Sequence, residues 1–205
     1  MLIFVKRREN DLIMAKTTQS YKYIKENAII SPDLDDYCLS IDEYYRIYSF
    51  YVTYSMCGNQ SAKKRSFQDY GWDANTIKGV DGAVLKKALK DVLDLTKAET
   101  SFVFAKDDNL KELFTKYQLE DAPLTDIERE RAVIVSAGGT NRYLNLFYRI
   151  RDGFAHGLFN LRYSTKREKM VVIEDHDQYN VTARIVIKLD TLIQFVYAID
   201  RNGKI

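Results

Sequence analysis

The sequence has few of the residues that stabilise small secreted domains or bind metals. It contains two cysteines, Cys38 and Cys57, with no Cys-x-x-Cys pair and no histidine near either. Disulfide frameworks and structural zinc sites need more ligands at closer, regular spacings. The pattern therefore favours two reduced, mostly buried thiols over a disulfide, and a disulfide over zinc.

Long apolar runs are also missing. A short apolar run at residues 1–5 is followed at once by Lys6, Arg7 and Arg8. A secretory signal places its charges before a longer apolar stretch, and a membrane span needs about 18 apolar residues. We therefore expect a cytoplasmic protein without membrane association. Met14 is an alternative start, which would leave the first thirteen residues outside the protein.

Proline and glycine are scarce as well, with two prolines and nine glycines in 205 residues, and this favours a helical chain. The net charge is only +2, so any case for nucleic-acid binding has to come from local clusters of charge. Aromatic residues, by contrast, are abundant: the chain has 15 tyrosines and 10 phenylalanines. Tyrosine suits places where one end of a side chain is apolar and the other is wet, so this content fits interfaces as well as a core.

Hydrophobic periodicity predicts a series of helices followed by a hairpin. Residues 1–30 are poorly periodic and are expected to form an N-terminal arm or short helix, whereas residues 31–205 are expected to form a single domain. Ser40-x-x-Glu43 and Thr125-x-x-Glu128 match capping boxes, which mark helix starts. The predicted helices cover about 40–56, 81–95, 108–117, 125–136 and 141–158. Two β-branched runs predict a hairpin at about 169–187, and Asp190 is expected to cap a final helix.

Three features have a structural and a functional interpretation. The aromatic stripe of the helix at 40–56 favours a core or subunit interface over a base-stacking platform. Lys63-Lys64-Arg65 is either a solvated surface run, which the pattern favours, or part of a phosphate-binding rim. His176 lies between two aspartates, and a hairpin loop explains this better than a metal site.

Residues 141–158 carry the strongest functional signal. Apolar residues at spacings of three and four draw a stripe on one helix face: Leu144, Phe147, Ile150, Phe154 and Leu158. Over this stripe lies Arg151-Asp-Gly-Phe-Ala-His156. Gly153 and Gly157 weaken a helix unless close backbone approach or a bend is needed. An arginine followed by a polar residue and then this histidine resembles the R-x4-6-H motif of the HEPN superfamily (higher eukaryotes and prokaryotes nucleotide-binding domains).

The resemblance implies a fold and a function. The fold is expected to be mainly α, an HEPN-like helical bundle with a C-terminal β-hairpin followed by a final helix. Many members are metal-independent ribonucleases whose sites lie across a homodimer interface. A narrower likeness, to HEPN proteins of bacterial plasmids and phage-defence loci, implies a toxin or antiviral effector. It is also compatible with an antitoxin or another inhibitory protein partner. No cofactor is expected.

The chemistry of Arg151 and His156 suits RNA cleavage without a metal. Histidine can both accept and donate a proton near neutral pH, and the arginine fork matches two phosphate oxygens. Five residues, however, place the two side chains about 140° apart around a helix. A bend at Gly153 or a two-fold axis beside the helix end would bring them together, and the axis also supplies a second histidine. The HEPN motif has a polar residue directly after the arginine, and Asp152 occupies that position here. The resemblance implies that its side chain orients Arg151 or the imidazole.

The surrounding chain is locally basic. Residues 141–169 contain seven basic and two acidic residues, a local excess that can attract phosphates. The RNA contacts expected from this segment are Arg149, Asn160, Arg162, Lys166 and Arg167. Some toxins of the superfamily carry a tyrosine two residues after the histidine, which a partner nucleotidyltransferase modifies; Leu158 stands here, so that partner is not expected.

Three functions therefore follow from the sequence. The first is a metal-independent endoribonuclease that acts as a homodimer. The second is an HEPN-like dimer that binds RNA or a nucleotide without cutting it. The third is a helical interaction protein that uses its aromatic surface.

Overall fold

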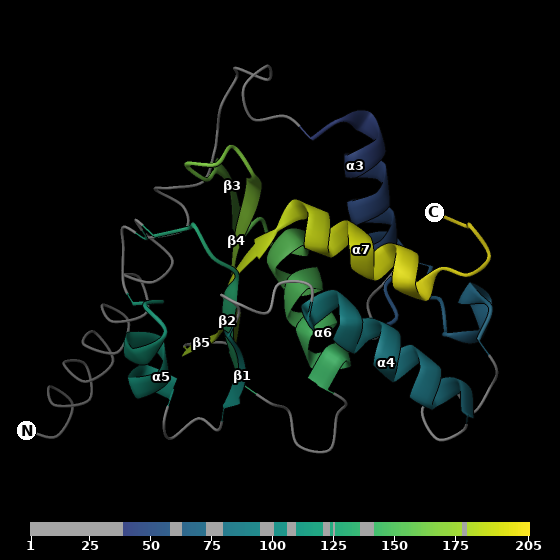
Figure 1. The fold of residues 1–205 in the computed structure, drawn as a ribbon, viewed down its shortest axis with the longest axis horizontal. Helices are drawn as coiled ribbons and strands as arrows, with labels where there is room; N and C mark the ends of the chain where they lie inside the picture. Colours follow the sequence, from purple (N-terminus) through teal and green to yellow (C-terminus); the bar gives the residue numbers. More distant parts are fainter. Residues whose placement is uncertain are drawn as a thin grey trace, which may run out of the picture.

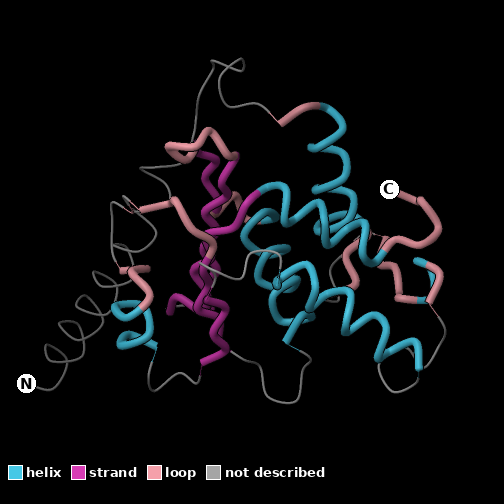
Figure 2. Tube along the Cα trace, viewed as in Figure 1, coloured by secondary structure: helices cyan, strands magenta, loops and turns pink. Residues whose placement is uncertain are grey.

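A computed structural model of the chain describes residues 39–57, 63–72, 80–94, 101–105, 110–120, 124, 126–135, 142–177 and 180–205. The predicted arm at 1–30 and Cys38 lie outside these residues. Figures 1 and 2 show a sheet with helices against it. The elements, in chain order, are α3 (Ile41–Ile47), the π-helix η1 (Tyr48–Thr53), the 3-10 helix η2 (Gln68–Tyr70), α4 (Val80–Asp94), β1 (Ser101–Ala105), α5 (Leu110–Lys116), β2 (Arg131–Val135), α6 (Arg142–Ala155), β3 (Phe159–Tyr163), β4 (Lys169–Asp177), β5 (Asn180–Lys188) and α7 (Leu189–Ile199).

The five strands form one sheet in the order β1-β2-β5-β4-β3. Strand β1 is parallel to β2, and the other neighbours are antiparallel. The prediction of a mainly α, helical-bundle fold is therefore wrong, as is an all-α classification. The hairpin that the sequence indicated is present as β4 and β5, but it lies inside a larger sheet.

The clearest error concerns residues 125–136, where a helix was expected after the Thr125 capping box. Instead, Arg131–Val135 forms β2, a strand whose first four residues are buried. A strand covered on both faces shows a continuous apolar run without alternation, and periodicity alone cannot distinguish such a run from a buried helix. The β-branched Val133 and Ile134 favour the extended conformation.

The hairpin strands are longer than predicted. Residues 174–177, expected to lie in the hairpin loop, continue β4, with a register shift between Asp175 and His176. Helix α7 follows β5 directly, and its N-cap is Lys188, which makes no side-chain capping hydrogen bond. Asp190 therefore does not cap this helix; it lies in the first turn, where its negative charge is favourable.

Several local predictions are confirmed. Ser40 and Glu43 form the capping box of α3: the Glu43 amide donates to Ser40 Oγ at 3.2 Å, and the Ser40 amide donates to Glu43 Oε2 at 2.7 Å. Helices α5 and α6 lie within the ranges that periodicity indicated, and α4 begins one residue before its predicted start. Among the described helices, none combines the length and apolarity that a bilayer crossing requires.

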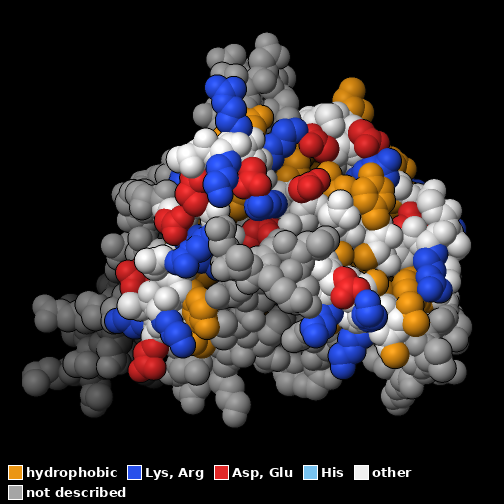
Figure 3. All heavy atoms as spheres, in the orientation of Figure 1, with side chains coloured by type: hydrophobic (Ala, Val, Ile, Leu, Met, Phe, Trp, Pro, Cys, Tyr) orange, Lys and Arg blue, Asp and Glu red, His pale blue; other side chains and the backbone are white. Residues whose placement is uncertain are grey.

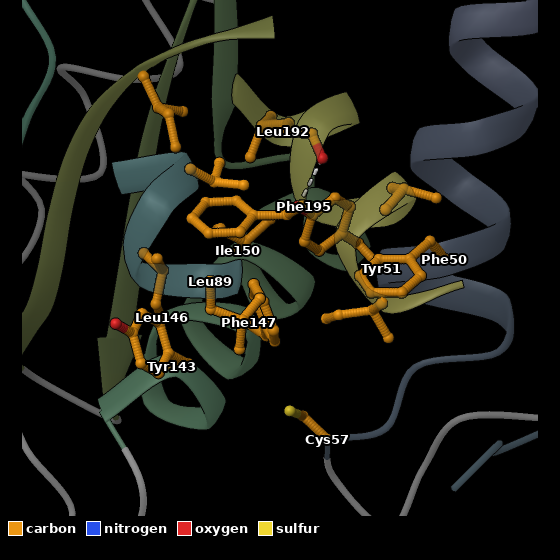
Figure 4. Packing of buried hydrophobic residues seen from close by; sticks show 14 of the residues in the cluster. Phe50, Tyr51, Cys57, Leu89, Tyr143, Leu146, Phe147, Ile150, Leu192 and Phe195 are labelled. Carbon is orange, nitrogen blue, oxygen red and sulfur yellow. Dashed lines mark hydrogen bonds between the residues drawn. The ribbon is translucent and has the colours of Figure 1, made fainter. Parts of the chain in front are cut away.

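The sheet separates two cores, because successive residues of a strand point to opposite faces. On one face, Val171 and Ile173 pack with helices α3, α4, α6 and α7, and on the other, Met170 and Val172 pack with α5. Figure 4 shows the larger core, where Phe147 of α6 lies edge-on to Phe195 at a centroid distance of 5.4 Å. Helix α6 is thus held between the sheet and the other helices.

Candidate active site at the end of α6

Helix α6 lies close to strand β4 because Gly153 has no side chain. A Cβ atom added at Gly153 would be 2.2 Å from Ile173 Cγ2 and 3.3 Å from the Glu174 carbonyl oxygen. The helix continues through Gly153 to Ala155. Of the two roles that the sequence suggested for this glycine, the structure shows close approach to the sheet.

The end of α6 is fixed by backbone hydrogen bonds. The Leu158 amide donates to the Gly153 carbonyl at 2.8 Å, and the Gly157 amide donates to the Phe154 carbonyl at 3.3 Å. Gly157 has a φ of +68°, so this is a Schellman ending with glycine in the left-handed region. His156 occupies the position before it, with its side chain exposed. Within the described residues, the imidazole has no hydrogen-bond partner.

Arg151 and Asp152 form an ion pair on the same helix. Arg151 Nη1 donates to Asp152 Oδ1, and both side chains are only 11% exposed. Arg151 Nε is buried and has no partner among the described residues. The structure therefore places the predicted polar neighbour directly on the guanidinium.

Tyr148, one turn before Asp152, completes this group. The negative charge of Asp152, together with burial and a hydrogen bond to that carboxylate, raises the pKa of Tyr148. Tyr148 is 38% exposed, so the phenol beside Asp152 is in contact with solvent. This contact was not expected from the sequence, although a spacing of four residues on one helix favours it.

Arg149, predicted to contact RNA, is bound internally. Its Nη1 donates to Asp175 Oδ2 at 2.6 Å, and Thr182 Oγ1 donates to the same oxygen at 2.9 Å. Burial raises the pKa of Asp175, and the charge of nearby Asp152 acts in the same direction, while Arg149 opposes it. Arg149 thus ties α6 to the β4–β5 hairpin.

Asn160 and Arg162 lie on the other face of the sheet. They pair in register with Val172 and Met170, whose side chains belong to the core under α5. Arg162 Nη1 donates to the Leu124 carbonyl at 2.8 Å, and Asn160 is only 3% exposed. The structure therefore does not bring these two residues to the end of α6 that carries Arg151, and their contacts with RNA stay a prediction. No strand was expected at 159–163, so the alternation of its side chains was missed.

Lys166 and Arg167 are exposed in the turn between β3 and β4. Arg167 has a φ of 60°, and its amide donates to the Ser164 carbonyl at 2.9 Å. The five residues of β3 extend about 16 Å, so this turn lies well away from His156. These residues are a separate basic surface at the opposite end of the strand.

The basic residues of the Lys63-Lys64-Arg65 run differ in their surroundings, because the two lysines are exposed and Arg65 is partly buried. Arg65 packs on the Tyr54 ring, with its Cζ 3.8 Å from the ring centroid. Burial raises the pKa of the Cys57 thiol to about 12, while the charges of Lys64 and Arg151 lower it and that of Asp152 raises it. Lys64 is exposed, and its charge and that of Arg151 both act on Cys57. A phosphate-binding role for this run stays a prediction.

Cys57 provides a test of this environment. Its thiolate fraction at neutral pH should be about 1,000-fold below that of an exposed thiol, because its pKa is about 12. In a Cys38→Ser variant, alkylation of the native protein at pH 7.5 should therefore be far slower than in denaturant, and should accelerate with rising pH. Equally fast labelling in both states would contradict this burial.

His176 is part of a buried group and not of a hairpin loop. Its Nε2 contacts Glu174 Oε1, while Arg184 Nε donates to Glu174 Oε2 at 2.8 Å. Across the described ranges, no group of three or more His, Cys, Asp or Glu side chains is arranged to hold a metal ion.

Comparison with known proteins finds no matching family model, no matching curated protein and no matching solved structure.

Proposed function

We propose that the protein is a metal-independent endoribonuclease that acts as a homodimer. His156 transfers protons, Arg151 binds the scissile phosphate, and Asp152 positions Arg151. The observation that carries this proposal is the end of α6, where an exposed imidazole without an internal partner follows a positioned arginine.

The reaction that suits these groups begins at the ribose. A histidine acting as base removes the proton of the 2′-hydroxyl as its oxygen attacks the adjacent phosphorus. The bond from phosphorus to the 5′-oxygen breaks, and a second histidine acting as acid protonates this leaving oxygen. The products are a 2′,3′-cyclic phosphate and a 5′-hydroxyl. Imidazole serves both steps at neutral pH because its unperturbed pKa is about 6.5.

Arg151 stabilises the charge that develops on the phosphate oxygens. Its paired N–H groups can replace one carboxylate contact by contacts to two phosphate oxygens. Asp152 keeps the guanidinium in place before RNA binds. Tyr148 lies close enough to Asp152 for that charge to raise the pKa of its phenol, so the carboxylate still has a polar neighbour when Arg151 turns towards RNA.

Two properties of the protomer support a homodimer. One protomer offers only His156 for both proton transfers, since His176 is held by Glu174. Arg151 and His156 are also about 140° apart around α6 if the helix is regular. A two-fold axis beside the helix end places both copies of each residue at one groove.

The test is incubation of the purified chain with single-stranded RNA in excess chelator. We expect fragments with cyclic-phosphate ends, at a rate that the chelator does not change. Expression of such an enzyme in cells should inhibit growth, as a toxin or phage-defence effector would. Intact RNA under all conditions would contradict the proposal.

A second candidate is a dimer that binds RNA or a nucleotide without cutting it. It is favoured by the state of the two arginines, because both Arg149 and Arg151 are paired with carboxylates and nearly buried. Lys166 and Arg167 would then supply the exposed charge. The same incubation separates the two functions: a shift in gel mobility with intact RNA supports binding alone.

A further inference from the structure

Tyr148 is the exposed position of an otherwise covered helix. Between Tyr143 and Phe154, where the structure describes every residue of α6, only Tyr148 is exposed. The other residues of this range are buried or partly buried. A molecule that reaches this part of α6 from solvent therefore meets the Tyr148 ring.

The ring lies beside the group that we assign to the phosphate. Arg151 and Asp152 follow Tyr148 by three and four positions, so the three side chains are neighbours on the helix surface, with Cβ atoms about 5–6 Å apart. The effect of the Asp152 charge on the phenol agrees with this placement. A nucleotide whose phosphate contacts Arg151 can therefore place an adjoining base against the ring.

The ring is held in place before any ligand binds. The Arg149 guanidinium lies over it, with Cζ 5.4 Å from the ring centroid. Arg149 is fixed in turn by Asp175 of β4, since its Nη1 is 2.6 Å from Asp175 Oδ2. A ring that has already lost most of its freedom pays less conformational entropy when a ligand stacks on it.

A single ring fits one base better than it fits a protein surface. A stable protein interface buries about 800 Å² on each partner, far more than one side chain offers. An aromatic ring can stack on an unpaired base of any type, because every base has a π-face. The chemistry of this position therefore favours a nucleobase.

Charge alone gives RNA little attraction to this part of the protein. Arg149 and Arg151 are each paired with a carboxylate, and the net charge of the chain is only +2. Figure 3 shows Lys and Arg side chains interspersed with Asp and Glu side chains on one face of the molecule. Because phosphate contacts supply most of the affinity only where positive charge is in excess, RNA bound at Arg151 needs a base contact as well.

We propose that Tyr148 stacks on the unpaired base beside the phosphate bound by Arg151, and that this contact restricts the site to single strands. The position of the phosphate rests on the proposed function, but the stacking contact is the same whether or not the strand is cut. In an A-form duplex the bases are paired and stacked on one another, so their faces cannot receive a protein ring. Single-stranded RNA is therefore the ligand, and duplex RNA is excluded.

The test is the binding of fluorescent oligomers to the full chain carrying His156→Ala, which prevents cleavage. The probes are a short oligoadenosine, which presents the same base in every register, and a ribose-phosphate oligomer of equal length and charge without bases. Addition of Tyr148→Leu should weaken binding of oligoadenosine about tenfold or more, the effect of removing one base–aromatic stack. Binding of the oligomer without bases should not change, because its phosphate contacts remain.

Two substitutions are matched controls. Tyr148→Phe keeps the ring and removes the hydroxyl, so oligoadenosine should bind within about twofold of the parent protein. Tyr163→Leu removes a tyrosine of equal exposure, 38%, at the end of β3, and should have no effect. Thermal melting should show that each variant is folded. If Tyr148→Leu is not, Tyr148→Gln provides the same comparison with another good helix former.

Three results would overturn the inference: oligoadenosine binding that survives Tyr148→Leu, an equal loss for the oligomer without bases, or a duplex that binds as tightly as the single strand. The equal loss would show that Tyr148 only positions Asp152 and Arg151. Binding that depends on Tyr148, in a wild-type protein that does not cut RNA, would support the stacking contact and contradict the proposed function. Cleavage that Tyr148→Leu leaves unchanged would do the reverse.

Discussion

Replacement of His156 by alanine should lower kcat/KM for RNA cleavage by about 10³-fold or more, because the imidazoles supply both proton transfers. The fold should be unaffected. The side chain of His156 is exposed, and the helix end is held by backbone hydrogen bonds from Gly157 and Leu158. Cleavage rates, thermal melting and RNA binding would be measured together. Lost cleavage with retained binding and melting temperature is the expected combination.

Mixing wild-type and His156→Ala subunits tests whether both imidazoles act at one site. When the two proteins are mixed in equal amounts, random exchange leaves about a quarter of the dimers fully wild type. Cleavage should then be about a quarter of that of wild-type protein at the same total concentration. Two independent sites would instead leave roughly half of the activity. That outcome, or full activity of the His156→Ala protein alone, would contradict the assignment of both proton transfers to the paired His156 side chains.

The Arg151→Ala variant should also lose cleavage, since the substitution removes the phosphate-binding group.

Replacement of Gly153 by alanine should produce the largest loss of stability among the substitutions considered, about 2–3 kcal/mol in the free energy of unfolding. The added Cβ would be 2.2 Å from Ile173 Cγ2, well inside any contact distance, and the Glu174 backbone restricts relaxation. Helix α6 would have to move away from β4, which would also displace Arg151 and His156. Chemical denaturation of wild-type and variant proteins measures the difference.

Gly157→Ala is the matched control, because it adds the same methyl group at the end of the same helix. No atom lies within 4 Å of its added Cβ, but its φ of +68° is unfavourable for alanine. It should therefore cost only about 1 kcal/mol, through backbone strain. In Gly153→Ala/Ile173→Ala the clash is removed, so the double variant should lose less than the two single losses added together. Equal losses at the two glycines, or simple additivity, would contradict the close packing.

The sequence by itself determined the elements whose signals are local. The Ser40–Glu43 capping box, the apolar stripe of α6 up to Phe154, and the β-branched runs of β4 and β5 depend on neighbours within a few positions. The type and spacing of Arg151, Asp152 and His156 likewise required no knowledge of the fold. These residues carry the proposed chemistry.

Only the tertiary structure decided the size of the sheet and the partners of the charged residues. Strand β2 is buried on both faces, so its sequence lacks the alternation that would identify it. Arg149 finds Asp175, which is 26 positions away, and the alternation of β3 turns Asn160 and Arg162 to the face opposite α6. Such contacts join segments that are distant along the chain, and buried charges must find partners wherever the fold brings them. A local pattern fixes which groups are available, but packing decides which of them remain free to meet a ligand.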